Sequence, residues 1–221
     1  MVTRDEALAL LESRYTRERR RGAEALRDLE DPSAAEAVGA ALSREVRDAR
    51  TWETQYQLVM ALGACGDERW SPWLRELAQT PREAWMVSLA IGDALVTIAH
   101  RTGRDGAAEG ALVWCLDAGE TVPLLAEGAV KALAMVPVGL SAPMRTRLLA
   151  LGIQTATVAD NLEDGPLAYW VAVAASDWLE DDPDDRATHD FLHACEASPS
   201  KQVRRAAATS LAGEVHELEV L

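Results

Sequence analysis

Hydrophobic residues in this chain recur at helical spacing inside segments that are broken by turn residues. Residues 23–42, AEALRDLEDPSAAEAVGAAL, show the pattern in a short space: an apolar stripe, an Asp-Pro break, and a second apolar stripe behind Ser33. Apolar residues three and four apart line one face of a helix, and an Asp-Pro pair ends one. Two short amphipathic helices joined by a tight turn cannot bury their apolar faces alone, so we expect other helices to cover them.

The same helix–turn–helix pattern returns along the chain. Its central pair of residues has counterparts, weaker in the last two copies, at Ala25-Leu26, Ala61-Leu62, Ala94-Leu95, Ala132-Leu133, Asp177-Trp178 and Ser210-Leu211. Successive Leu or Trp positions are 36, 33, 38, 45 and 33 residues apart. This period predicts an all-α fold, an α-solenoid of about five to six stacked antiparallel helix pairs with about ten to thirteen helices. We expect burial between neighbouring repeats for Ala61, Leu62, Ala94, Leu95, Ala132, Leu133 and Leu211.

Signals for helix starts fall where this scheme needs them. Capping boxes are predicted at Thr3 with Glu6, Ser33 with Glu36 and Thr80 with Glu83, and prolines suited to a first helical position stand at Pro72 and Pro81. No alternating strand pattern of useful length occurs. We therefore expect a single domain over residues 1–221, with residues 1–15 as an N-terminal capping helix and residues 200–221 as a C-terminal capping helix and tail.

The segment from Ala61 to Asp67, ALGACGD, carries a family resemblance. It matches an AxALGxxGD-like pattern that is degraded in the other copies, and with these copies the chain resembles the HEAT-repeat family in its short bacterial form. The resemblance covers nearly the whole chain and implies a solenoid of stacked helix pairs, but it implies almost nothing about function. Tetratricopeptide repeats have a similar period, but their Trp, Leu-Gly and Tyr spacing is absent here.

The formal charge of −14 is unevenly distributed. Residues 1–50 carry 10 basic and 11 acidic side chains, whereas residues 105–196 carry 4 basic and 16 acidic ones. Such a field repels phosphate backbones and membrane surfaces, so we expect neither nucleic acid nor a membrane as partner. The acidic surface either attracts a cationic protein partner or only keeps the chain soluble.

The pattern of apolar residues and cysteines predicts a cytoplasmic protein. The start of the sequence, MVTRDEALALLESR, lacks the apolar region of a signal peptide, and no stretch approaches 18 apolar residues without a charge. Cys65, Cys115 and Cys195 are odd in number and far apart, and each lies inside an apolar helical pattern. We interpret them as reduced core residues.

Two imidazoles in HDFLHACE offer the one arrangement typical of a metal site. His189 and His193 share a helix face, with Glu196 further along. Without a third and a fourth ligand, a His pair at this spacing usually lies on an exposed helix face and binds no metal. We therefore predict no metal and no cofactor. Deoxyhypusine hydroxylase, a HEAT-like di-iron enzyme, uses several His-Glu dipeptides to hold its irons. This chain has only one, His216-Glu217, which is too few, so we reject a resemblance to that enzyme. HEAT-like alkylpurine DNA glycosylases are similar in length and Trp content, but they need a basic groove.

No Ser-His-Asp order, P-loop, GxGxxG unit or paired-Cys motif occurs, so we expect no enzyme activity. Trp52 and Tyr56 could line a groove for a peptide, although tryptophans more often fill gaps between stacked helices. Arg17, Arg20 and Arg21 share one predicted helix face. They form a solvated face paired with acidic neighbours, a site for an acidic partner, or a site for the acidic half of a second copy. We favour a monomer.

These observations favour a non-catalytic protein–protein interaction scaffold or adaptor, including an inhibitor that masks a basic partner protein. The alternatives are an enzyme-accessory HEAT protein resembling the bilin lyases and, third, a HEAT-like DNA glycosylase. The acidic turn and the helix expected from about Asp184 to Glu196 form the candidate partner-binding site. Its residues are Glu180, Asp181, Asp182, Asp184, Asp185, Asp190 and Glu196, and the secondary patch is Arg17, Arg20, Arg21, Trp52 and Tyr56.

Overall fold

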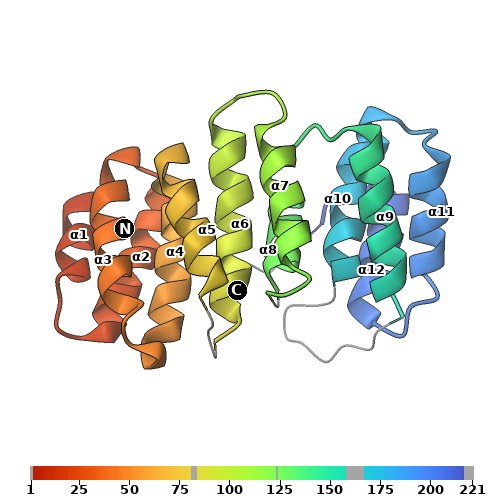
Figure 1. Ribbon diagram of the computed structural model, residues 1–221. Coiled ribbons are helices and arrows are strands. Elements are labelled where there is room, and N and C mark those ends of the chain that lie inside the picture. The colour runs from red at the N-terminus through yellow and green to blue at the C-terminus, as the bar shows by residue number, and fades with distance from the viewer. Residues whose placement is uncertain (1, 81–83, 123, 158–166, 217–221) are drawn as a thin grey trace. The chain divides into compact units, whose positions relative to one another are not determined.

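The computed structural model describes residues 2–80, 84–122, 124–157 and 167–216, and this part of the chain is all-α, without a strand (Figure 1). Its twelve α-helices are α1 (Arg4–Leu11), α2 (Thr16–Leu29), α3 (Ala35–Glu45), α4 (Trp52–Cys65), α5 (Ser71–Gln79), α6 (Met86–Arg101), α7 (Ala107–Ala118), α8 (Leu125–Leu133), α9 (Ala142–Thr155), α10 (Leu167–Asp181), α11 (Arg186–Cys195) and α12 (Lys201–Leu211). Contacts divide the chain into unit 1, residues 1–132, and unit 2, residues 133–221.

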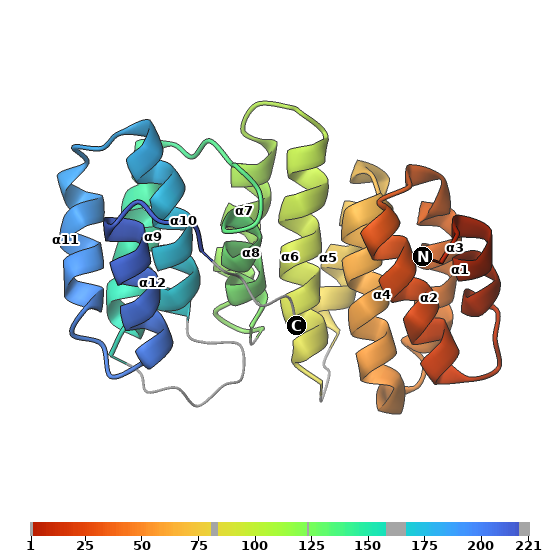
Figure 2. The ribbon, with the colours of Figure 1, turned by 180° about the vertical axis from the view of Figure 1, so that it is seen from behind.

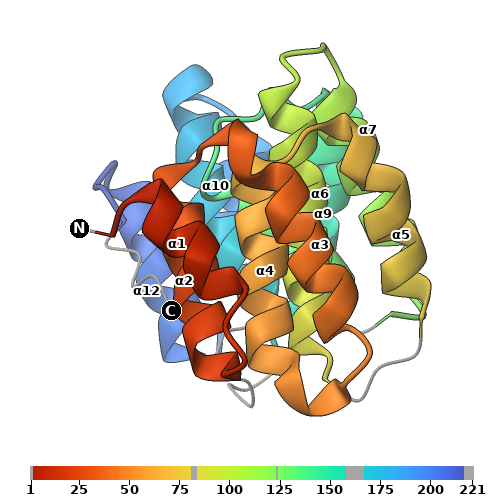
Figure 3. The same ribbon diagram turned by 90° about the vertical axis from the view of Figure 1, so that its left-hand side faces the viewer.

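Unit 1 is a stack of helices in two layers. Helices α2, α4 and α6 lie side by side in one layer, each contacting the next, while α1 and α3 contact each other in the second layer (Figures 2 and 3). The apolar stripes of the repeat face the space between neighbouring helices, where Leu26, Leu62 and Leu95 are fully buried. Ala61, Ala94 and Ala132 are buried as well, and so is Leu133, the first residue of unit 2, so the predicted burial is confirmed for these copies.

Two glycines bring α6 and α8 into backbone contact. A Cβ atom added at Gly92 would lie 2.1 Å from the carbonyl oxygen of Leu125, and one added at Gly128 would lie 1.8 Å from that of Leu89. These separations are far below van der Waals contact, so any side chain at either position would force the two helices apart.

Unit 2 is built around α10, which contacts α9, α11 and α12; α10 and α12 lie side by side in Figure 2. The predicted burial of Leu211 is wrong, because α12 turns Ser210 inward and leaves Leu211 partly exposed. The Ser210 hydroxyl donates a hydrogen bond to the Ala172 carbonyl oxygen at 2.7 Å, which satisfies a polar group inside the α10–α12 contact.

The helix caps agree with the sequence in part. The Thr3–Glu6 capping box is present, and proline stands in the first turn of α5. The box predicted at Ser33 is wrong: Asp31 caps a short 3-10 helix there, accepts from the Ser33 backbone N–H at 2.9 Å, and delays the start of α3 to Ala35. Pro81 and Glu83 lie outside the described residues.

The sequence correctly predicted the all-α fold of stacked helix pairs, and the twelve helices of the described residues fall in the expected range. The predicted helix at Asp184–Glu196 is shorter, because Asp185 is its cap and α11 proper is Arg186–Cys195. The single-domain organisation over residues 1–221 stays a prediction.

Candidate protein-binding surfaces

Four predicted partner-binding residues form an exposed acidic turn between α10 and α11. Glu180 and Asp181 end α10, and Asp182 and Asp184 follow in the turn; we call these four residues the acidic turn. All four are exposed, and none of them forms an ion pair within the described residues. The last turn of α10 contains no basic side chain. The negative end of the helix dipole therefore coincides with a run of carboxylates.

The other predicted acidic residues are engaged locally. Asp185 accepts hydrogen bonds from the backbone N–H groups of Ala187, at 3.0 Å, and Thr188, and from the Thr188 hydroxyl, at 2.8 Å. Partial burial acts to raise the pKa of Asp185, but these hydrogen bonds outweigh it and lower the pKa. Asp190 lies 3.7 Å from Arg186, one helical turn away. Asp185 is thus a structural cap of α11, and the free charge lies in the acidic turn.

The pKa of the neighbouring Asp177 reflects the repulsion among carboxylates at this end of α10. Although Asp177 is exposed, partial desolvation raises the pKa of its carboxyl group, and the charges of Glu180 and Asp181 raise it further. Mutual repulsion among the carboxylates is therefore part of the local energetics.

The two histidines of α11 do not converge on a common point with other ligands. Their rings are stacked, with centroids 6.4 Å apart. His189 donates from Nε2 to the Pro183 carbonyl oxygen at 2.9 Å, and His193 Nδ1 lies 3.0 Å from Glu196. Among the described residues, no group of three or more His, Cys, Asp or Glu side chains is arranged to hold a metal ion.

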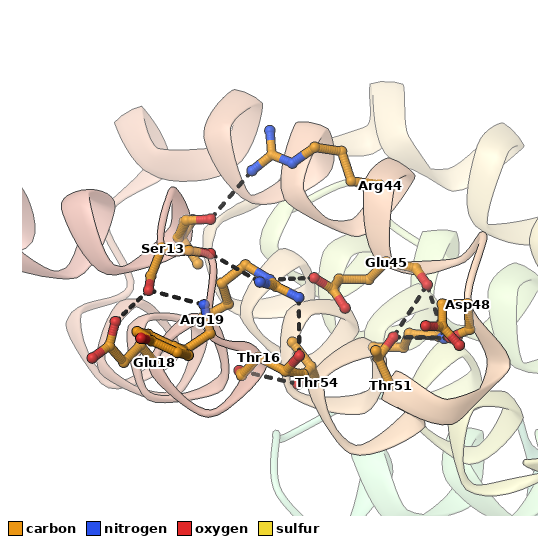
Figure 4. A network of polar contacts seen from close by, with 12 residues as sticks. Ser13, Thr16, Glu18, Arg19, Arg44, Glu45, Asp48, Thr51 and Thr54 are labelled. Carbon is orange, nitrogen blue, oxygen red and sulfur yellow. Dashed lines mark hydrogen bonds and ion pairs between the residues drawn. The ribbon is translucent and has the colours of Figure 1, made fainter.

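In unit 1, a polar network joins the α1–α2 connection to the end of α3 (Figure 4). Arg19 donates from Nη1 to the Ser13 carbonyl oxygen at 2.8 Å and from Nη2 to the Thr16 hydroxyl at 3.1 Å, and its Nε is paired with Glu45. Glu45 is 5% exposed, and Arg19 supplies the opposite charge that a buried carboxylate needs. The network fastens the first helix pair to the second.

A cleft of about 300 Å³ opens beside this network. It is lined by charged and hydroxyl side chains together with Leu11, and Arg44, at its edge, donates to the Leu11 carbonyl oxygen at 3.2 Å and to Glu12 at 2.9 Å. Within the cleft, Arg19 is bonded to Thr16 and Glu45, and Arg44 to Glu12.

The predicted secondary patch is divided by ion pairing. Arg20 is paired with Glu53 on α4 and lies 3.6 Å from Glu24, whereas Arg17 and Arg21 are exposed on α2. On α4, Trp52 is 39% exposed and Tyr56 is half-buried. The partner-binding roles of these residues stay predictions.

A buried carboxylate on α6 was not predicted from the sequence. Asp93 is 6% exposed and accepts a hydrogen bond from the Thr97 hydroxyl at 3.2 Å. Burial raises the pKa of Asp93 to about 6, although the positive charges of Lys131 and Arg27 act to lower it. The available signal was its place inside the apolar run VSLAIGDALVTIA, where a charge must be buried or break the stripe.

The three cysteines are free and buried, as predicted. Burial raises the pKa of Cys65 and Cys195 to about 11 and that of Cys115 to about 12, so the reactive thiolate form is scarce at neutral pH. Within the described ranges, no helix has the length and apolar character needed to cross a bilayer.

Comparisons with known proteins assign no family to the chain. No family model matches it, and no curated protein matches it. Among solved structures, the chain is similar to a designed armadillo repeat protein, with 18% sequence identity over 96% of this chain and 99% of the other and a TM-score of 0.44.

Proposed function

We propose that this chain is a non-catalytic protein-binding repeat protein, of the short bacterial HEAT type, whose acidic turn binds a basic protein partner in the cytoplasm. The observation that carries the proposal is the contrast in how carboxylates are neutralised. In unit 1, carboxylates such as Glu12, Glu45 and Glu53 are paired with arginines, whereas the four of the acidic turn have no ion pair with any described residue.

This arrangement costs stability in the absence of a partner. Carboxylates in the last turn of a helix oppose its dipole, which typically costs about 0.3–1 kcal/mol each, and like charges one turn apart cost about 0.2–0.5 kcal/mol per pair. A cationic surface docked on the turn would offset both the unfavourable interaction with the helix dipole and the repulsion between the carboxylates. Solvation alone would be served equally well by carboxylates placed at helix starts, where the dipole favours them.

The features of the cysteines and of the repeats support the rest of the proposal. Buried thiols with raised pKa values suit a reducing compartment. Helical repeat proteins commonly present extended surfaces to other proteins. An inhibitor that masks a basic protein is the most specific form of the proposal, because electrostatic complementarity speeds association with a cationic target.

The test is affinity capture from the native host with three matched baits. The first is the wild-type chain, the second is D181K/D182K/D184K, and the third is D28K/E36K/E76K, which makes the same change of charge at exposed positions on α2, α3 and α5. Asp185 is left intact because it caps α11. We expect a basic protein bound by the first and third baits and lost from the second. Equal capture by all three baits, or capture only of acidic proteins, would contradict the proposal.

A further inference from the structure

Three parallel helices of unit 1 each begin at an exposed aromatic residue. Tyr15 directly precedes α2, Trp52 is the first residue of α4, and Trp85 directly precedes α6. These residues are 53%, 39% and 51% exposed, although large apolar side chains of this size are generally well covered. Helices α2, α4 and α6 start along one edge of unit 1, the lower edge in Figure 1. We call Tyr15, Trp52 and Trp85 the aromatic row.

The same edge carries arginines whose charge no carboxylate balances. Arg17, in the first turn of α2, and Arg47, between α3 and α4, are exposed, and their side chains make no ion pair or hydrogen bond with any described residue. Arg14 lies over the Tyr15 ring, with its guanidinium carbon 4.6 Å from the ring centroid. Its Nη2 donates to the Tyr15 hydroxyl, and its other N–H groups make no bond with any described residue, so they are available for an anion.

The described carboxylates around the starts of α2 and α4 are already engaged. Residues 12–21 and 44–53 hold eight arginines and five carboxylates, so these two segments are positive although the whole chain carries −14. The engaged pairs are Glu12 with Arg44, Glu18 with Ser13, Glu45 with Arg19, Asp48 with Arg50 and Glu53 with Arg20. Among the described residues at the starts of α2 and α4, what remains open to a ligand is cationic and aromatic.

The spacing of the aromatic row fits an extended chain. Neighbouring packed helices lie about 8–10 Å apart. An extended segment in the polyproline II conformation has three residues per turn and advances about 3.1 Å per residue, so every third side chain points the same way about 9 Å further along. A segment lying across the starts of α2, α4 and α6 would therefore bring about every third side chain onto successive aromatic residues. The side chains between them would face Arg17 and Arg47.

We propose that the aromatic row and its arginines bind an extended acidic segment of a partner protein, with apolar or aromatic side chains at about every third position. A polynucleotide fits this edge less well, because its closely spaced charges meet the repulsion of the whole chain, whereas a short segment interacts mainly within a Debye length of about 8–10 Å. The acidic turn of a second copy is held as a turn by the Asp185 N–H, which donates to the Asp182 carbonyl oxygen, and cannot lie extended along the row.

The test uses labelled synthetic peptides of about twelve residues, which is about 40 Å when extended. One has Trp or Leu at every third position and Glu elsewhere, one is a scrambled peptide of the same composition, and one replaces Glu by Lys. Fluorescence anisotropy with the full chain should show binding of the patterned acidic peptide that is about tenfold or more tighter than that of the other two. R17E and R47E should each weaken it about tenfold and flatten its salt dependence.

Matched variants separate this surface from general effects. R101E makes the same change of charge at the far end of α6 and should leave binding unchanged. W52A should weaken binding about tenfold, W52F should restore most of it, and the melting temperatures should stay close to that of the wild type. Equal binding of patterned and scrambled peptides, equal effects of R17E and R101E, tighter binding of single-stranded DNA, or charge-dependent self-association would each overturn the proposal.

Discussion

Asp93 should make the stability of the protein depend on pH in a way that one substitution removes. Its carboxyl group is 6% exposed on α6, and its pKa is about 6 in the folded chain against 3.8 for an ordinary aspartate. Because the folded-state pKa lies above the unfolded value, the folded protein holds the proton more tightly. Asp93 therefore contributes stability that is fully present below pH 3.8 and is lost as the pH rises through about 6.

The magnitude follows from the two pKa values. The difference corresponds to about 3 kcal/mol between the protonated and the ionised group. Asp93→Asn keeps the shape and the oxygen that accepts from Thr97, but it cannot ionise. At about pH 7.5 the variant should be more stable than the wild type by up to about 3 kcal/mol, and at about pH 5 this advantage should be smaller by about 1.4 kcal/mol.

Urea unfolding of the wild type and of D93N at both pH values measures this difference. D28N, which changes an exposed carboxylate on α2, is the control for general charge effects and should show no such pH-dependent gain. Two results would contradict this expectation. The difference in the free energy of unfolding between D93N and the wild type could be the same at both pH values, or D93N could be the less stable protein at pH 7.5. Either result would mean that the charges of Lys131 and Arg27 outweigh the burial of Asp93, and the expected pH dependence would be refuted.

Leu62→Asp should lower the free energy of unfolding by about 3–5 kcal/mol, because Leu62 is fully buried between repeats; a melting temperature within a degree or two of the wild type would show that the register is wrong. Gly92→Ala should cost about 1–3 kcal/mol by pushing α6 away from Leu125, whereas Gly110→Ala, with nothing within 4 Å of the added Cβ, should gain about 0.5–1 kcal/mol; urea unfolding of both tests the α6–α8 contact, and equal effects would refute it. Duplex DNA should show no binding stronger than about 10⁻⁴ M at physiological salt, and micromolar, salt-sensitive binding in a titration would reverse this expectation and direct attention to residues 14–21.

The fold could be predicted from the sequence because the same pattern of buried residues occurs in several copies of the repeat. Leu26, Leu62 and Leu95 occupy one position of an apolar stripe, and each copy supports the register of the others. The last copy is degraded, so the other copies gave little support to its register, and the predicted burial of Leu211 was wrong because Ser210 is the buried residue. At residues 31–33 two residue types suited to capping stand close together, and the short 3-10 turn that decides between them leaves no clear trace in the sequence.

The candidate surfaces were only partly predictable, because ion pairing depends on how repeats stack. Arg20 and Glu53 are 33 residues apart and belong to different helix pairs, so their pairing follows from the α2–α4 contact and not from local spacing. The same holds for Arg19 with Glu45. The acidic turn could be predicted as a cluster, since its residues are adjacent in sequence, but the capping role of Asp185 depends on where α11 begins.

The most direct test of the proposed function is the rate at which the captured basic partner associates with the chain at different salt concentrations. Stopped-flow measurements would compare the wild type, D181K/D182K/D184K and D28K/E36K/E76K. We expect that reversing the acidic turn slows association about tenfold or more and flattens the salt dependence, while the control triple variant leaves the rate within about twofold of the wild type. An unchanged rate and salt slope for D181K/D182K/D184K would show that the acidic turn is a solvated surface with no part in binding.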